Sequence, residues 1–424
     1  MIRLSISGFR GEGMRRNRED LKESLWHMRV VAICFVAALP VLGGIALVQS
    51  ASSLKEVVVS LNRETLSEAG TEAETILIQN FPLRNAFVDL NGLEQNLLNR
   101  NIVEDAGMTL VKDSKGYLHS LQERVEVKEQ AVNVAAMHRW LGESDIPFLY
   151  VAAPYKADTN KEYLPVGTED GTRENKTEFL EYLRSFHVPF LDISSSEEAA
   201  IEFYRTDHHW TIGSAWRAVR ESIRSLDRAG FELIYDKRIA QSDSYVYRAE
   251  TGGFLGSQGR RVGRLYAGQD DFTYVIPDFD TDMYFAHLVE GGTVYEASGS
   301  FGEALISPPL DTGYAPDYYS TYMNNSWRQM IVKNHASMND KKVLVISDSF
   351  GRPFGAFLSL YFGETVVVDI QKGRFEEDLY QFIEGYDPDV VIMLFNGGML
   401  NDKGLYQFDK RMSFSDLKPC HGIT

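Results

Sequence analysis

Three residues that together could perform nucleophilic catalysis occur in two short stretches of the sequence. Asp207 and His209 lie in residues 204–211 (YRTDHHWT), and Ser349 lies in residues 346–351 (ISDSFG). An Asp two residues before a His can accept the Nδ1–H bond of the imidazole, which fixes the tautomer and leaves Nε2 free as a base. Such a base can activate a serine hydroxyl as a nucleophile. We therefore expect Asp207, His209 and Ser349 to form a hydrolase-type triad, although the first two alone could equally be a hydrogen-bonded polar loop.

A second histidine, His208, directly precedes His209 and raises the question of a metal site. Consecutive side chains of an extended segment point to opposite sides, so the two imidazoles are not expected to share one ion. The sequence shows no further acidic or histidine cluster at metal-ligand spacing. We expect no metal and no other cofactor, and a structural role for His208.

Alternating apolar strands and helices predict an α/β domain with a parallel sheet covered by helices. Residues 232–335 interrupt this alternation with a glycine-rich and aromatic-rich excursion, and an insertion of this length is usually a lid or a substrate wall. The expected strands are 146–152, 188–193, 342–346, 364–370 and 389–395, and the expected helices between them are 176–186, 353–361 and 375–384.

Three candidate site residues each follow one of the last three strands. Because the carboxyl ends of parallel strands meet at one edge of a sheet, we expect these residues to lie close together. Ser349 lies where a strand gives way to a helix, so backbone N–H groups and the helix dipole face its hydroxyl. Gly373 would allow close approach of a backbone N–H, and Asn396 could donate its side-chain amide to an oxyanion. Either could instead be a simple turn residue.

Three further residues are candidate substrate contacts. Lys156 follows the strand 146–152 and is a candidate site cation, although a lysine in a solvated loop is the simpler interpretation. Trp210 closes the Asp-His stretch, and Arg260 lies in the glycine-rich part of the excursion.

An uncharged apolar segment near the N-terminus predicts one membrane-spanning helix. Residues 30–48 read VVAICFVAALPVLGGIALV, and no charged residue lies between Arg29 and Lys55, which is long enough to cross a bilayer. Basic residues precede this segment, so we expect the N-terminus on the cytoplasmic side of the cell membrane and the bulk of the chain on the other side. A signal peptide cleaved near Gln49-Ser50-Ala51 is the alternative, but the long leader and the long apolar run favour a retained anchor.

The composition excludes some classes of function. The net charge of −17 argues against a nucleic-acid binder that tracks phosphates. The two cysteines, Cys34 and Cys420, provide neither a disulfide framework nor a CxxC metal site. The expected organisation is a cytoplasmic basic segment (1–29), a membrane anchor (30–50), a stalk and N-terminal extension (51–120) and a catalytic domain (121–424).

These motifs resemble those of the DHHW proteins, which are relatives of the alginate O-acetylation proteins within the SGNH hydrolase superfamily. Residues 207–210 read DHHW, and residues 348–351 (DSFG) resemble the family's serine block, with Ser347 in place of the usual Gly. Residues 80–84 (NFPLR) and 254–257 (FLGS) are also similar, so the resemblance extends over most of the extracytoplasmic part. As in the alginate type, the Asp-x-His precedes the Ser along the chain.

The resemblance implies an SGNH-hydrolase-like (flavodoxin-like) fold and an O-acyltransferase that acetylates a cell-surface or secreted polysaccharide. It places Asn396 at the family's third-strand Asn, whereas Gly373 matches only by position. It also implies a multispanning membrane partner that supplies the acetyl group. A carbohydrate esterase with the same triad, and a non-catalytic glycan-binding or assembly protein with the same fold, are the alternatives.

Overall fold

The structure is a computed structural model that describes residues 9–60, 66–105, 108–195, 201–289, 292–325, 327–372 and 379–408. The chain divides into two compact units, Met1–Val88 and Asp89–Thr424.

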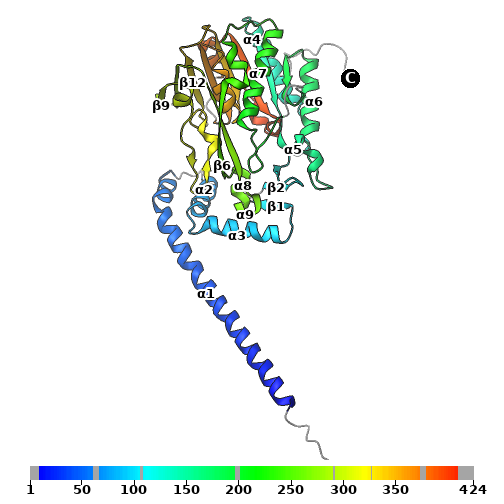
Figure 1. The fold of residues 1–424 in the computed structure, drawn as a ribbon, viewed down its shortest axis with the longest axis vertical. Coiled ribbons are helices and arrows are strands. Elements are labelled where there is room, and N and C mark those ends of the chain that lie inside the picture. The colour runs from blue at the N-terminus through cyan, green and yellow to red at the C-terminus, as the bar shows by residue number, and fades with distance from the viewer. Residues whose placement is uncertain are drawn as a thin grey trace, which may run out of the picture. The chain divides into compact units, whose positions relative to one another are not determined.

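The first unit is helical. Helix α1 extends over Phe9–Ser60 and α2 over Leu66–Gln79 (Figure 1). Within α1, the segment Met28–Lys55 has a mean hydropathy of 2.6 and is long and apolar enough to cross a membrane. A helix of this kind is typical of a membrane anchor or of a signal sequence. The next helix, α3 (Arg84–Leu97), belongs to the second unit from Asp89 onward.

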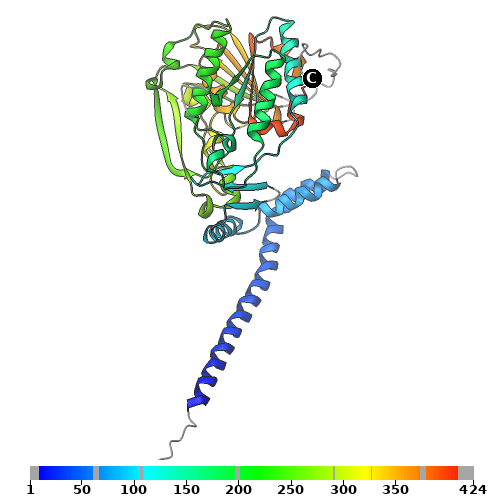
Figure 2. The same ribbon diagram turned by 90° about the vertical axis from the view of Figure 1, so that its right-hand side faces the viewer.

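The second unit is built on an eight-stranded sheet with helices on both faces (Figures 1 and 2). The strand order is β5-β4-β15-β13-β14-β12-β8-β9. The first five strands are parallel to one another, which confirms the predicted strands, and the last three are antiparallel. In sheet order the strands are Phe190–Asp192, Phe148–Ala153, Val390–Asn396, Lys342–Ser347, Glu364–Asp369, Gln329–Asn334, Met283–Val289 and Gly292–Gly299.

Alternate residues of the central strands pack on opposite faces of the sheet. Val343 and Val345 of β13 belong to an apolar cluster that includes residues of α7 and α11, whereas Leu344 and Ile346 pack with α4, α6 and α12 on the other face. Because helices cover both faces, these strands are continuously apolar, and this pattern made them recognisable in the sequence. The helices are α4 (Lys128–Gly142), α6 (Thr172–Ser185), α7 (Ile212–Arg228), α11 (Gly351–Leu358) and α12 (Leu379–Tyr386).

Part of the segment 232–335 belongs to the central sheet and is not a separate excursion. Its strands β12, β8 and β9 extend the central sheet beyond β14, so the sheet is mixed rather than entirely parallel. Antiparallel pairing with β12 removes the unpaired edge that β14 would otherwise present. The same segment forms a two-stranded ribbon and two short helices, which are β6 (Tyr245–Phe254), β7 (Asp270–Pro277), α8 (Ser257–Val262) and α9 (Arg264–Ala267).

Smaller elements complete the unit. A three-stranded antiparallel sheet precedes α4, and it consists of β1 (Ile102–Asp105), β2 (Met108–Lys112) and β3 (Leu118–Ser120). The other short elements are α5 (Lys156–Thr159), α10 (Phe301–Leu305), β10 (Leu310–Asp311) and β11 (Pro316–Asp317).

The junction between β13 and α11 is tightly packed around Gly351. A Cβ atom on Gly351 would lie 2.0 Å from Ser347 Oγ and 2.6 Å from Ser347 Cβ. Ser347 ends β13 and is fully buried. The glycine is therefore required because a serine side chain occupies the space beside it.

We expect Gly351→Ala to lower the free energy of unfolding by roughly 1–3 kcal/mol, because the new methyl group overpacks this junction. Urea unfolding of the full chain measures the loss. The matched background is Ser347→Gly, in which the same Gly351→Ala change should cost much less because the opposing side chain is gone. Equal costs in the two backgrounds would show that Ser347 is not the obstacle.

Candidate active site

The loop that carries Asp207 and His209 is closed at its base by a bridge between Phe203 and Trp210. It leads into α7, whose first turn is capped by Thr211, because the Thr211 hydroxyl accepts the Ser214 N–H at 3.3 Å. The chain bends throughout residues 205–209 rather than running extended. This bend determines where the two histidines point.

The structure brings His209 within hydrogen-bond distance of both Asp207 and Ser349. His209 Nδ1 lies 2.5 Å from Asp207 Oδ1, and His209 Nε2 lies 2.7 Å from Ser349 Oγ. The backbone N–H of His209 also donates to Asp207 Oδ1 at 3.0 Å. The carboxylate thus orients an imidazole whose other nitrogen faces a hydroxyl, which is the arrangement of a nucleophile and its base.

Aromatic rings surround His209 and exclude water from it. Its ring stacks on Tyr319 at a centroid distance of 3.8 Å and lies 5.1 Å from the Phe350 ring. Burial, and to a lesser extent the neighbouring His208, lowers the pKa of His209 to about 3. At neutral pH the imidazole is therefore uncharged, the form in which it can take a proton.

Asp207 is buried and remains ionised. Burial by itself would raise its pKa, but the adjacent His209 and His208 and the hydrogen bonds from His209 and the Ser257 N–H hold that pKa well below its usual range. Ser257 N donates to Asp207 Oδ2 at 2.6 Å. This approach requires glycine at the preceding position, since a Cβ on Gly256 would lie 2.2 Å from Asp207 Cβ.

Lys156 lies beneath the catalytic loop, and its position differs from both interpretations of the sequence. Its side chain is buried, and Nζ lies within hydrogen-bond distance of the backbone carbonyls of Tyr204 (3.1 Å), Arg205 (3.3 Å) and Asp207 (2.5 Å) and of Gln258 Oε1 (2.8 Å). Burial lowers the pKa of Lys156 to about 7, while nearby carboxylates favour the charged form. The lysine is neither solvated nor open to a substrate, because the loop and Gln258 already accept its hydrogen bonds.

Asp270 of β7 supports the same loop, and no motif in the sequence indicates this role. Its carboxylate accepts the backbone N–H groups of Arg205 and Thr206 at 3.1 and 2.8 Å and the Thr206 hydroxyl at 2.6 Å. Thr206 Oγ1 in turn accepts the Gly256 N–H at 2.9 Å. The loop is therefore fixed by long-range hydrogen bonds rather than by its own sequence.

Asn396 does not provide the open oxyanion donor that its place after the third strand suggested. Its side-chain amide donates to Asp348 Oδ2 at 2.7 Å, and its Oδ1 accepts the Gly398 N–H at 2.9 Å. Asp348 also accepts the Asn396 and Phe350 backbone N–H groups at 3.0 and 2.8 Å, and burial raises the pKa of Asp348 to about 7. Asn396 therefore anchors the residue that precedes Ser349.

A cation that sequence reasoning missed lies beside Ser349. Arg352 Nε donates to the Ser349 carbonyl at 3.3 Å, Nη1 donates to Asn325 Oδ1 at 3.4 Å, and the guanidinium lies 4.8 Å from the centre of the Tyr319 ring. Within the described ranges this largely buried arginine makes no ion pair with an acidic side chain. Its position one turn after the serine, in ISDSFGR, was the available signal.

Two further predicted site residues, Trp210 and Arg260, are not part of the hydrogen-bonded group around His209. Trp210 is fully buried, with its ring 5.1 Å from Phe350, so it belongs to the core. Arg260 Nη1 donates to the Leu255 carbonyl at 3.0 Å, and its Nη2 lies 3.4 Å from Asp317. Gly373 lies outside the described residues.

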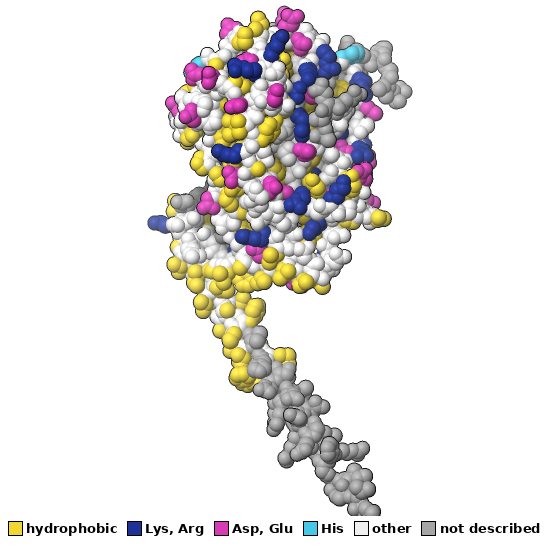
Figure 3. Space-filling view, viewed as in Figure 1, with side chains coloured by type: hydrophobic (Ala, Val, Ile, Leu, Met, Phe, Trp, Pro, Cys, Tyr) yellow, Lys and Arg dark blue, Asp and Glu magenta, His cyan; other side chains and the backbone are white. Residues whose placement is uncertain are grey.

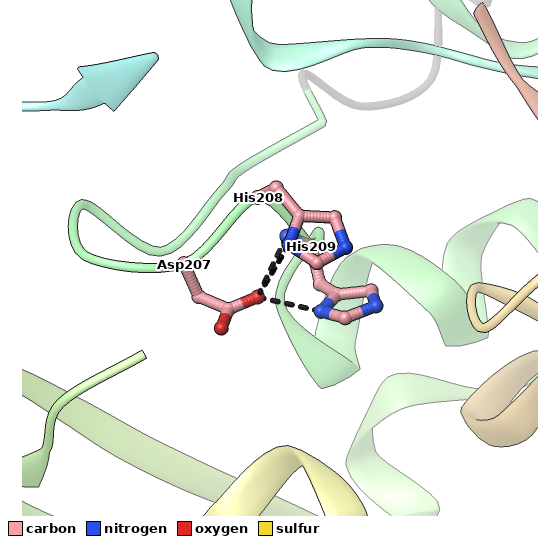
Figure 4. Close-up of side chains that lie close together, drawn as sticks. All are labelled: Asp207, His208 and His209. Atoms are coloured by element: carbon pink, nitrogen blue, oxygen red, sulfur yellow. Dashed lines mark hydrogen bonds and ion pairs between the residues drawn. The ribbon is translucent and has the colours of Figure 1, made fainter. Parts of the chain in front are cut away.

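The two histidines lie on the same side of the bent loop, contrary to the expectation for an extended segment (Figure 4). Their ring centroids are 3.8 Å apart, and the possible ligand atoms of Asp207, His208 and His209 all lie within 4.8 Å of one another. Both nitrogens of His209 are engaged by Asp207 and Ser349, and His208 Nδ1 lies 2.9 Å from Ser257 Oγ. A metal ion here would have to displace these hydrogen bonds, so the donor set fits proton transfer better than metal binding.

We expect Asn396→Ala to lower the free energy of unfolding by roughly 1–3 kcal/mol, because it removes the side-chain donor to the buried Asp348 and leaves the Gly398 N–H without its acceptor. The partly exposed Asn401, which donates to the Glu123 carbonyl, provides the matched control, and Asn401→Ala should change stability little. A loss of turnover of about 10²–10³ with unchanged stability would instead identify Asn396 as an oxyanion donor.

Comparisons with known proteins agree with this fold. Residues 113–245, which include the DHHW loop, match the profile of a family described as the SGNH hydrolase-like domain of acetyltransferase AlgX. No curated protein sequence matches the chain significantly.

Two solved structures are similar over most of the chain. PatB1 of Bacillus cereus, solved with a sulfonyl adduct, has a TM-score of 0.57 and 17% identity and covers 71% of this chain and 100% of its own. A DHHW family protein from Eubacterium siraeum DSM 15702 has a TM-score of 0.55 and 20% identity and covers 73% of this chain and 97% of its own. Residues 113–245 are therefore similar to an AlgX-type SGNH hydrolase-like domain, and the fold is similar to that of PatB1 and the DHHW family protein.

Proposed function

We propose that this protein is a membrane-anchored, serine-dependent O-acyltransferase that acetylates a polysaccharide outside the cytoplasm. The observation that carries the proposal is the 2.7 Å contact between His209 Nε2 and Ser349 Oγ, with Asp207 on the other imidazole nitrogen. Ser349 is partly exposed whereas His209 and Asp207 are buried. A substrate can therefore reach the hydroxyl without disturbing the groups that activate it.

The reaction proceeds in two steps through an acetyl-serine. Ser349 Oγ attacks the acetyl carbonyl of a donor ester while its proton moves to His209 Nε2, and the donor alcohol leaves with that proton. A sugar hydroxyl then gives its proton to His209 and attacks the acetyl-serine, which forms the new ester and returns the proton to Ser349. Asp207 stabilises the imidazolium that exists between these transfers.

Negative charge on the acetyl oxygen is stabilised at the start of α11. The Ser349 N–H and the N-terminal end of this helix face that oxygen, and the Arg352 guanidinium adds a full positive charge beside the serine. The Gly373 N–H, which follows β14, is the proposed second backbone donor. Asn396 contributes by holding Asp348 in place.

The substrate class rests on the resemblance to the alginate O-acetylation proteins and on the acetyltransferase named in the matching profile. The polysaccharide is the acceptor, and a multispanning membrane protein supplies the acetyl group. A carbohydrate esterase would use the same triad with water as acceptor, and a glycan-binding protein would keep the fold without the chemistry.

An activated acetyl ester tests the chemistry directly. We expect the mass of the intact full chain to rise by one acetyl group, and Ser349→Ala to abolish this adduct. His209→Ala should slow acetylation by about 10⁴ because the base is lost, whereas the matched variant His208→Ala should retain most of the rate. Equal loss in both folded histidine variants would show that the base is wrongly assigned.

Discharge of the acetyl-serine separates the three functions. An oligosaccharide acceptor should discharge it faster than buffer does, because a bound hydroxyl gains proximity that bulk water lacks. Equal discharge with and without every acceptor would indicate the esterase, and no adduct in the folded protein would indicate the binding protein.

The proposed location predicts the topology of the intact chain. A reporter fused to the C-terminus should be active only when it requires an extracytoplasmic position, and the N-terminus should remain with the membrane fraction. Recovery of a soluble form that begins near Ala51 would show that Met28–Lys55 is a cleaved signal sequence.

A further inference from the structure

Within the second unit, the polar side of helix α3 faces helices α8 and α9. Asp89 accepts the Arg264 N–H at 2.8 Å and forms an ion pair with the same arginine at 3.1 Å, and Asn96 donates to the Leu265 carbonyl. Gly92 lies between them on the same side, and a Cβ there would come within 2.4 Å of the Val262 carbonyl oxygen. Polar groups and a glycine therefore make the contact with α8 and α9.

The opposite side of α3 is apolar and exposed. Leu90, Leu93 and Leu97 follow helical spacing and face away from Gly92. Neighbouring segments add three more exposed apolar side chains to the same region, and Figure 3 shows hydrophobic side chains gathered along this edge of the second unit. The six residues and their exposed fractions are Leu90 (59%), Leu93 (39%), Leu97 (78%), Leu98 (53%), Ile102 (52%) and Leu265 (46%).

This orientation is the reverse of that of a surface helix in a water-soluble protein, whose apolar side faces the core. Exposed apolar patches of this kind mark surfaces that are covered by a partner or by a membrane. We propose that these six residues, called the α3 face, dock the second unit onto the lipid surface of the membrane that Met28–Lys55 crosses. The proposal rests on the membrane anchor of the proposed function but not on its acyltransferase activity.

Chain connectivity favours lipid as the occupant. The α3 face follows the apolar segment Met28–Lys55 in the same polypeptide, so the bilayer is always present at high effective concentration. A helix with leucines on one side and hydrogen-bonded polar groups on the other lies in the plane of the interface, with its leucines among the upper acyl chains. Glu94 is exposed one turn after Leu90, on the same side as the leucines, so docking requires its carboxylate to remain at the level of the headgroups.

Helix α8 connects the α3 face to the catalytic loop. At its first residue the Ser257 N–H binds Asp207, and at its last residue the Val262 carbonyl lies against Gly92 of α3. Docking through α3 therefore places the loop that carries Asp207 and His209 close to the membrane surface, where lipid-soluble or membrane-bound donors are available.

Fluorescence of the full chain in lipid vesicles tests this proposal. The probe is the environment-sensitive dye NBD on Leu97→Cys, in a background with Cys34→Ser and Cys420→Ser, in phosphatidylethanolamine–phosphatidylglycerol vesicles that hold at most one chain each. The matched control is Met338→Cys, which is 59% exposed in the loop after β12. Circular dichroism and a cooperative thermal transition show that each labelled protein is folded.

We expect the dye at position 97 to emit at a shorter wavelength than the dye at position 338. Nitroxide-bearing lipids should quench the dye at position 97 and place it about 5–10 Å below the headgroups. Water-like emission at both positions would overturn the proposal. Apolar emission at 97 without quenching by lipid nitroxides would also overturn it, because a protein surface would then cover the α3 face.

Discussion

The hydrogen bonds from the buried Lys156 ammonium to the backbone of residues 204–207 are the interaction on which the active site depends. The bent segment lies outside helices and strands, so its carbonyl groups need partners from elsewhere, and leaving them buried without partners would be costly. A single cation at the carboxyl end of β4 satisfies three of them. Asp270 satisfies the N–H groups of the same segment from the other side, so the loop has one stable shape.

This fixed loop allows a charged acid and an uncharged base to coexist out of water. Asp207 remains ionised because the Ser257 N–H and the His209 ring donate to it, whereas burial keeps His209 neutral. The base is thus ready to accept a proton, and the carboxylate is ready to stabilise the resulting imidazolium. The site requires no reorganisation at the moment of proton transfer, which is the advantage of a preorganised environment.

The sequence predicts the parallel half of the fold because its strands are buried on both faces and read as uninterrupted apolar runs. It does not predict that residues 232–335 complete the sheet, since half-buried antiparallel strands such as β12 mix polar and apolar residues as loops do. The resemblance to a known motif brings Asp207, His209 and Ser349 into one hypothesis, and the structure brings them within hydrogen-bond reach. The roles of Lys156 and Asp270 could not be read from spacing, because both depend on contacts between residues that are far apart in sequence.

The most direct test of the account is the rate at which a sulfonyl fluoride modifies Ser349, measured against pH on the full chain. Modification requires the neutral form of His209, whose pKa is lowered by burial. The account predicts that one sulfonyl group is attached to Ser349. It also predicts that the rate is maintained as the pH falls through 6.5, the ordinary pKa of histidine, and is lost only when the pH falls through the lowered pKa of His209. No modification of Ser349 in the folded protein, or loss of rate at or above pH 6.5, would contradict it.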